Sequence, residues 1–203
     1  MNFLDDQNNY GSSDKKWGKP IIVVPGSTDY PGNICLKNAV QFLRDGVYIP
    51  PNDVKLSEEE KYQSKKTFDK KIGEQTVTFE VYDSTHTFTE KHWQRVVCVF
   101  TCGEVFQLKD WPPKDSNDKP LNEKERQMKT VNLFHRVKGF YLHYQDILEP
   151  PVIKTWNVSR FIVQRNKRHS DINIKNSIWK ELEVFLRREK FHFPEFDGVS
   201  KKY

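Results

Sequence analysis

The loop between Gly26 and Gly32 lies where nucleotide-binding proteins carry the loop that holds phosphate. A P-loop follows the pattern G-x-x-x-x-G-K-[ST], in which backbone amides cradle the phosphates, Lys neutralises them and Ser or Thr binds Mg²⁺. Here the glycines lie one residue further apart, Asn33 replaces the Lys, and Ile34 replaces the magnesium ligand. Asp29 adds negative charge to the same loop. The sequence therefore predicts that this loop does not bind a nucleoside triphosphate.

Residues 166–169 read Asn-Lys-Arg-His and partly match N-K-x-D, the motif with which GTP-binding proteins recognise guanine. His169 replaces the carboxylate of that motif, and the nearest acid, Asp171, comes two residues late. We interpret the segment as a basic turn between the last strand and the last helix. A divergent nucleotide-binding switch remains the alternative function, because a helix N-terminus attracts anions without either motif.

Residues that bind metals or attack substrates do not occur at the required spacings. Cys98 and Cys102 lie four apart in a strand-like run, so they share one face, and a metal site would need two further ligands. The six His show neither H-x-x-x-H nor H-E-x-x-H, and no nucleophile elbow G-x-S-x-G is present. The sequence predicts no metal site, no cofactor and no enzymatic activity.

The positive charge of the chain is concentrated near its C-terminal end. The 203 residues contain 33 Lys and Arg against 28 Asp and Glu, and residues 151–203 alone contain 12 against 6. Such a basic region indicates an acidic partner, such as a phosphorylated peptide, an acidic protein surface or nucleic acid. A solvated helix surface would show the same excess. The candidate partner contacts flank the last helix: Arg165, Lys167, Arg168, His169, Arg187 and Arg188.

Membrane and secreted classes of protein fit this sequence poorly. No apolar run approaches the roughly 20 residues that span a bilayer. The N-terminal segment lacks the charged and apolar regions of a signal peptide, and three Cys are too few for a disulfide framework. We expect a reducing compartment and no membrane partner.

Strands and helices are expected to alternate along the chain. A helix over 33–45 is expected to begin at Asn33 and to end at Gly46, and the last helix to begin at Asp171 or Asn173. A further helix is expected over 122–134, from the capping-box spacing of Asn122 and Glu125. Strands are expected at 20–25, 76–82, 95–100, 137–144 and 156–164. This order predicts a three-layer α/β fold with a mostly parallel central sheet and helices on both faces.

The chain is expected to form one domain over residues 19–193, with tails at 1–18 and 194–203. Residues 52–75 contain many charged side chains and few apolar ones, so we expect a solvated insertion with at most one frayed helix. Aromatic residues make up 13% of the chain, which indicates a real core despite the polar composition.

Several segments together resemble the C-terminal domain of the parafibromin family. Two are specific in combination: W-x-R-V-V-x-V-F at Trp93–Phe100, and K-x-W-[ND]-V at Lys154–Val158, followed by Asn-Lys-Arg-His. The order and spacing agree from about residue 20 to 190. The other matching segments are residues 20–28, 42–51, 106–112 and 136–144.

This resemblance implies a Ras-like domain without a working nucleotide site. It also implies a nuclear protein of the RNA polymerase II-associated factor (PAF) complex, which supports transcription elongation and histone modification. The implied partners are phosphorylated tails of RNA polymerase II and of elongation factors, together with other PAF-complex subunits. Direct nucleic-acid binding through the basic face is a further alternative. Family members usually carry a long N-terminal region, so a fragment and a short family member are both left open.

Overall fold

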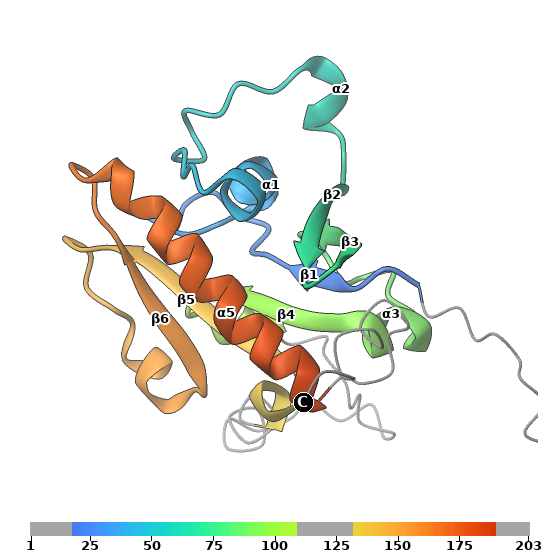
Figure 1. The fold of residues 1–203 in the computed structure, drawn as a ribbon. Coiled ribbons are helices and arrows are strands. Elements are labelled where there is room, and N and C mark those ends of the chain that lie inside the picture. Colours follow the sequence, from blue (N-terminus) through green and yellow to red (C-terminus); the bar gives the residue numbers. More distant parts are fainter. Residues whose placement is uncertain (1–17, 109–131, 190–203) are drawn as a thin grey trace, which may run out of the picture.

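A six-stranded, mostly parallel sheet forms the centre of the protein. The structure is a computed structural model that describes residues 18–108 and 132–189 (Figure 1). The strands lie in the order β2-β3-β1-β4-β5-β6, in which β2 and β3 are antiparallel and the other neighbours are parallel. Their bounds are β1 Ile21–Val23, β2 Lys65–Ile72, β3 Gln75–Tyr82, β4 Val96–Thr101, β5 Lys138–Tyr144 and β6 Val158–Val163. The predicted fold class is confirmed.

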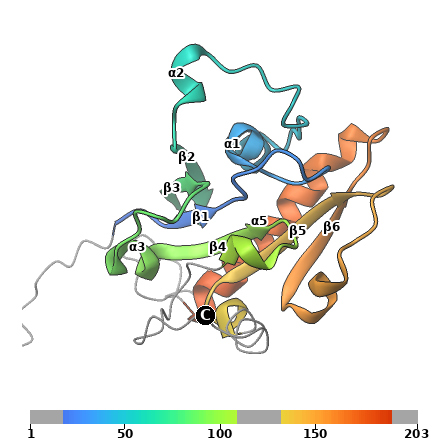
Figure 2. The ribbon, with the colours of Figure 1, turned by 180° about the vertical axis from the view of Figure 1, so that it is seen from behind.

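The two longer helices cover the same face of this sheet, as both views show (Figures 1 and 2). They are α1 (Leu36–Asp45) and α5 (Asp171–Glu189). Shorter helical segments make up the other layers and the connections: α2 Glu58–Lys61, α3 Glu90–Arg95, and the 3₁₀ segments η1 Val105–Leu108, η2 Pro151–Thr155 and η3 Arg168–Ser170. Within the described ranges, no helix is long and apolar enough to cross a membrane.

The larger part of the core lies between the sheet and the helices α1 and α5. Fully buried rings from the central strands, among them Phe79, Phe100 and Phe140, fill this layer. Trp179 of α5 packs against Phe79, and its indole N–H donates a hydrogen bond to the Leu43 carbonyl at 2.8 Å. An apolar stripe of α5 faces this layer, buried at Ile178, Leu182, Phe185 and Leu186 and half-buried at Ile174.

A second apolar cluster covers the opposite face of the sheet. Val23, Val99 and Tyr141 contribute from the strands, and Phe134 and Trp156 pack against them from outside. The rings of Phe134 and Trp156 lie 5.4 Å apart. Because consecutive strand side chains point to opposite faces, the continuous apolar runs of β1 and β4 supply both clusters.

The predicted start of α1 at Asn33 is wrong. The helix begins at Leu36 with Cys35 as its N-cap, and it ends at Gly46 as predicted, where the backbone is left-handed (φ 76°). Asn33 is buried, and its side-chain amide donates a hydrogen bond to the Thr101 carbonyl at 3.1 Å. A long-range contact therefore uses the side chain that local sequence had assigned to capping.

The interpretation of 52–75 as a solvated insertion misses a strand. Lys65–Ile72 forms β2 at the edge of the sheet, paired along its length with β3. Only Phe68 and Ile72 of this strand are buried.

The helix expected at 122–134 falls partly outside the described residues. Residues 132–134 are helical, in a segment that runs to 136, while residues 122–131 are not described. Most of the two expected tails also lie outside the described residues. The division into tails and domain stays a prediction.

Replacing Phe100 by Ala should lower the free energy of unfolding by about 3–5 kcal/mol, because it leaves a cavity beside Phe140 in the fully buried layer. Urea denaturation measures this loss. The exposed Lys91 is the control, and Lys91→Ala should stay within about 0.5 kcal/mol of the wild type. Equal losses for the two variants would contradict the burial described above.

Candidate functional site

The backbone of the loop 26–34 is packed against the protein itself. The amides of Asn33 and Ile34 donate hydrogen bonds to the Tyr30 carbonyl and to the Asn33 side-chain oxygen. Gly32 has a left-handed backbone (φ 83°), and a Cβ there would lie 2.2 Å from the Tyr144 backbone nitrogen. Acceptors within the loop therefore use these two amides, whereas a phosphate-binding loop presents its amides to the ligand.

Arg168 holds the beginning of α5 against the segment that follows α1. Its guanidinium donates to the Tyr48 carbonyl at 2.6 Å and forms an ion pair with Asp171. The Tyr48 amide donates to the same carboxylate at 3.3 Å, and the Tyr48 hydroxyl donates to the Asn33 carbonyl at 2.9 Å. This arrangement favours a structural role for Arg168.

The Asp171 carboxylate is almost completely buried, with 1% of the residue exposed. Burial raises its pKa above the ordinary value, and the charge of Arg168 opposes that shift. One carboxylate oxygen, Oδ1, has no hydrogen-bond partner among the described residues. A buried carboxylate in this position depends strongly on its single cationic partner.

The remaining predicted contacts near the beginning of α5 differ in how available they are. Arg165 forms an ion pair with Asp146 at 3.1 Å, and its guanidinium carbon lies 3.6 Å from the centre of the Tyr144 ring. Lys167 and His169 are exposed. At this end of α5, Lys167 and His169 are therefore the side chains best placed to meet a partner.

Arg187 and Arg188 lie at the other end of α5, so the structure divides the six predicted contacts into two groups (Figure 1). At 1.5 Å per helical residue, about 25–30 Å separates the two groups. The six residues thus flank α5 at its two ends and do not form one continuous patch. Whether either group binds a partner stays a prediction.

Two adjacent cavities flank the C-terminal half of α5. Lys70, Lys180 and Arg187 line a cavity of about 320 Å³ together with Trp179, and Lys138, Lys180 and Arg188 line one of about 460 Å³. We call these five cations the α5 basic surface: Lys70, Lys138, Lys180, Arg187 and Arg188. Glu183 lines the first cavity and Glu181 the second.

Two cations of the α5 basic surface lie on strands, and the sequence analysis did not identify them as candidate contacts. The Lys70 ammonium of β2 lies 5.3 Å from the Trp179 ring centre. Lys138 of β5 forms an ion pair with Glu181 at 2.8 Å. No local pattern marks either residue, because each lies far along the chain from the helix that it approaches.

The cysteines lie in protected surroundings. Burial raises the pKa of the thiols of Cys35, Cys98 and Cys102, which lowers their thiolate fraction and their reactivity. In the part of the chain that the structure covers, no group of three or more His, Cys, Asp or Glu is placed to hold a metal ion.

Comparison with known proteins identifies similar sequences and a similar fold. Residues 16–185 match the family model described as "RNA pol II accessory factor, Cdc73 family, C-terminal". The chain is 34% identical over 177 residues to the CDC73 homolog of Arabidopsis thaliana, and this alignment covers 84% of this chain and 39% of that protein. It is 29% identical over 173 residues to cell division control protein 73 of Schizosaccharomyces pombe, and this alignment covers 82% of this chain and 42% of that protein. The chain thus spans about two fifths of the length of these curated relatives.

The conserved domain of yeast Cdc73 has the same fold. It superimposes with a TM-score of 0.68 at 24% sequence identity, covering 86% of this chain and 100% of the solved one. The expected Ras-like α/β architecture is therefore confirmed.

Replacing Arg168 by Ala should lower the free energy of unfolding by about 1–3 kcal/mol, because it leaves the Asp171 carboxylate buried without its cation. Adding Asp171→Asn should recover part of that loss, since the amide removes the charge and keeps an acceptor for Tyr48. A double-mutant cycle by chemical denaturation measures this coupling. Additive losses would show that the pair does not act as a unit.

Proposed function

The chain belongs to the Cdc73, or parafibromin, family of RNA polymerase II accessory factors, and we propose that it is a non-enzymatic interaction domain in transcription elongation. In this proposal the domain acts in the nucleus as part of a PAF-complex subunit. It helps to bring the complex to RNA polymerase II and to chromatin, where the complex supports histone modification. Its partners are phosphorylated or acidic protein tails and other subunits of the complex.

The α5 basic surface is the observation that carries this proposal. Lys70, Lys180 and Arg187 surround one cavity beside the Trp179 ring, and Arg188 borders the next. A phosphorylated Ser or Thr brings about −1.5 to −2 charges and three acceptor oxygens, which suit guanidinium and ammonium donors. The two acidic residues in these cavities, Glu181 and Glu183, limit how far a nucleic-acid backbone could follow the same surface.

The nucleotide-binding alternative finds no support in the geometry of the loop 26–34. The amides of Asn33 and Ile34 bind acceptors within the loop, and the backbone at Tyr144 lies against Gly32. Nucleic-acid binding has only the charge in its favour, and a steep dependence of affinity on salt would distinguish it.

The double variant Arg187→Glu/Arg188→Glu should weaken the binding of a phosphoserine-containing acidic peptide at least about tenfold, because each lost charge-assisted contact is worth about 1.5–3 kcal/mol. Fluorescence anisotropy with the phosphorylated and unphosphorylated peptides measures this, and circular dichroism checks folding.

The matched control is Lys91→Glu/Lys154→Glu, which changes the net charge equally at exposed positions on α3 and η2. This control should bind nearly as the wild type does. An equal loss in both double variants would mean that net charge alone governs binding. Tighter and more salt-dependent binding of random duplex or single-stranded nucleic acid would favour the nucleic-acid alternative.

A further inference from the structure

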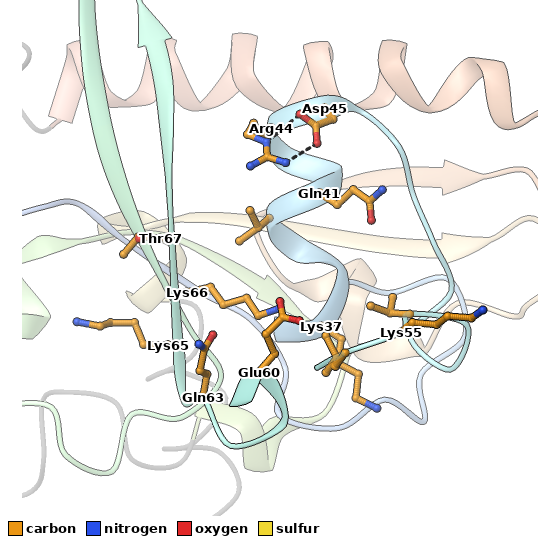
Figure 3. Close-up of a pocket in the computed structure, with 13 residues that line it drawn as sticks. Lys37, Gln41, Arg44, Asp45, Lys55, Glu60, Gln63, Lys65, Lys66 and Thr67 are labelled. Carbon is orange, nitrogen blue, oxygen red and sulfur yellow. Dashed lines mark hydrogen bonds and ion pairs between the residues drawn. The ribbon is translucent and has the colours of Figure 1, made fainter. Parts of the chain in front are cut away.

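A groove of about 650 Å³ lies between α1 and β2, away from the residues that the sequence singled out (Figure 3). Its floor on the α1 side is one stripe of the helix, made of Lys37, Val40, Gln41, Arg44 and Asp45. Lys37, Gln41 and Asp45 lie four residues apart, as do Val40 and Arg44, so these positions share one face of the helix. Lys37, Arg44 and Asp45 are exposed, and Val40 is half-buried at the edge of the core. The rest of the lining comes from 54–56, from α2, and from Gln63 to Thr67 at the beginning of β2.

Cations outnumber acids in this lining. The five cations are Lys37, Arg44, Lys55, Lys65 and Lys66, and the two acids are Asp45 and Glu60. Arg44 binds Asp45 through two contacts of 2.9 Å, and Lys65 pairs with Glu80 at 3.2 Å.

Lys37 and Lys55 form no ion pair with any residue in the described ranges. The groove therefore has positive charge without an internal partner. Such charge suits an anionic ligand that enters from outside.

Glu60 of α2 lies where such a ligand would bind. The side chains of Glu60 and Lys66 point toward one another in the groove, with 3.6 Å between the carboxylate and the ammonium (Figure 3). The other carboxylate oxygen accepts a hydrogen bond from the Ser57 amide at 3.0 Å. That bond and the charge of Lys66 lower the pKa of Glu60, which keeps it ionised. Lys66 is the less exposed partner of this pair, with 14% of its side chain accessible against 42% for Glu60.

The segment that carries Glu60 is held weakly. Helix α2 contains four residues, and none of them is buried. Burial of apolar surface is the main force that fixes a short helix in a protein, and α2 lacks it. A ligand that binds Lys66 more strongly can therefore displace Glu60 at a small cost in free energy.

We propose that the α1–β2 groove binds a phosphorylated serine or threonine of an acidic protein tail, and that Glu60 is an internal competitor for Lys66 which the phosphate displaces. This inference rests on the proposed function, because it takes the same class of partner. In this arrangement Lys66 contacts the phosphate, and Lys37 and Lys55 add positive charge to the same groove. Gln41 and Thr67 supply further polar contacts from the groove wall.

The composition of the groove favours a peptide over other phosphate carriers. No aromatic side chain is among the residues that line it, so a nucleotide base would have no ring to stack on. Asp45 and Glu60 interrupt the positive charge, which opposes a continuous nucleic-acid backbone and leaves room for an isolated phosphate.

The groove lies within reach of the α5 basic surface along β2. Lys70 lies on the same strand as Lys66, four residues later, which corresponds to about 13 Å. Lys175 of α5 feels the charges of both the groove and the α5 basic surface. Burial and the charge of Lys70 lower the pKa of Lys175, while the charge of Asp45 raises it. An extended tail of about four residues spans this distance, so one tail can contact both places.

Two variants test the groove in opposite directions. Lys37→Glu/Lys55→Glu should weaken the binding of the phosphoserine peptide about tenfold or more, while the matched control Lys91→Glu/Lys154→Glu leaves it nearly unchanged. Both groove lysines are exposed, and Lys37→Gln/Lys55→Gln serves as a second variant should the glutamates disturb folding. Glu60→Gln removes the competing charge and keeps an acceptor for Ser57, so it should bind the peptide several-fold more tightly.

Titration with the peptide, followed by amide NMR, locates the contact. Shifts at residues 37–45 and 65–67 are expected for the wild-type protein. Unchanged affinity in the lysine and Glu60 variants, with binding lost in Arg187→Glu/Arg188→Glu, would overturn the groove and leave the proposed function standing. A wild-type protein that does not distinguish phosphorylated from unphosphorylated peptide would overturn both.

Discussion

Burial of the Asp171 carboxylate is the constraint that fixes how α5 lies on the sheet. The carboxylate binds Arg168 and the Tyr48 amide, and Tyr48 in turn binds the carbonyl of Asn33. One buried charge thus joins the first loop, the segment after α1 and the beginning of α5. About two helical turns later, the indole N–H of Trp179 donates a hydrogen bond to the Leu43 carbonyl and so gives α5 a second connection to α1. The placement of the α5 basic surface relative to α1 follows from these contacts.

Much of the fold could be predicted because its central strands are apolar on both faces. The runs at Ile21–Val23 and Val96–Thr101 can only be buried, and Gly46 ends α1 for a reason that is local in sequence. Strand β2 could not be recognised in the same way. Its two buried residues, Phe68 and Ile72, lie four apart among lysines, because an edge strand exposes most of its side chains.

The candidate site was harder to predict, because charge along the chain does not show where a side chain ends up. Arg168 looked available among its basic neighbours, yet its partner Tyr48 lies 120 residues away. Lys70 belongs to the surface of a helix that begins a hundred residues later. The groove combines α1 with lining residues between 54 and 67, and all of the latter lie in the part of the chain that had been interpreted as a solvated insertion. Ion pairs and cavities of this kind join residues that are far apart in the sequence, so they can be recognised only once the topology is known.

The close contact at Gly32 also bears on what it would take for this loop to bind a phosphate. Placing Lys and Ser at positions 33 and 34 would supply the side chains of the motif but would leave the loop packed on β5, where a Cβ at Gly32 would lie 2.2 Å from the Tyr144 nitrogen. It would also remove the Asn33 contact with Thr101, on which the packing of the loop depends. Nucleotide binding would therefore require a change in the backbone of the loop as well as in its side chains. The position of the backbone, as well as the side chains, thus separates this loop from one that binds phosphate.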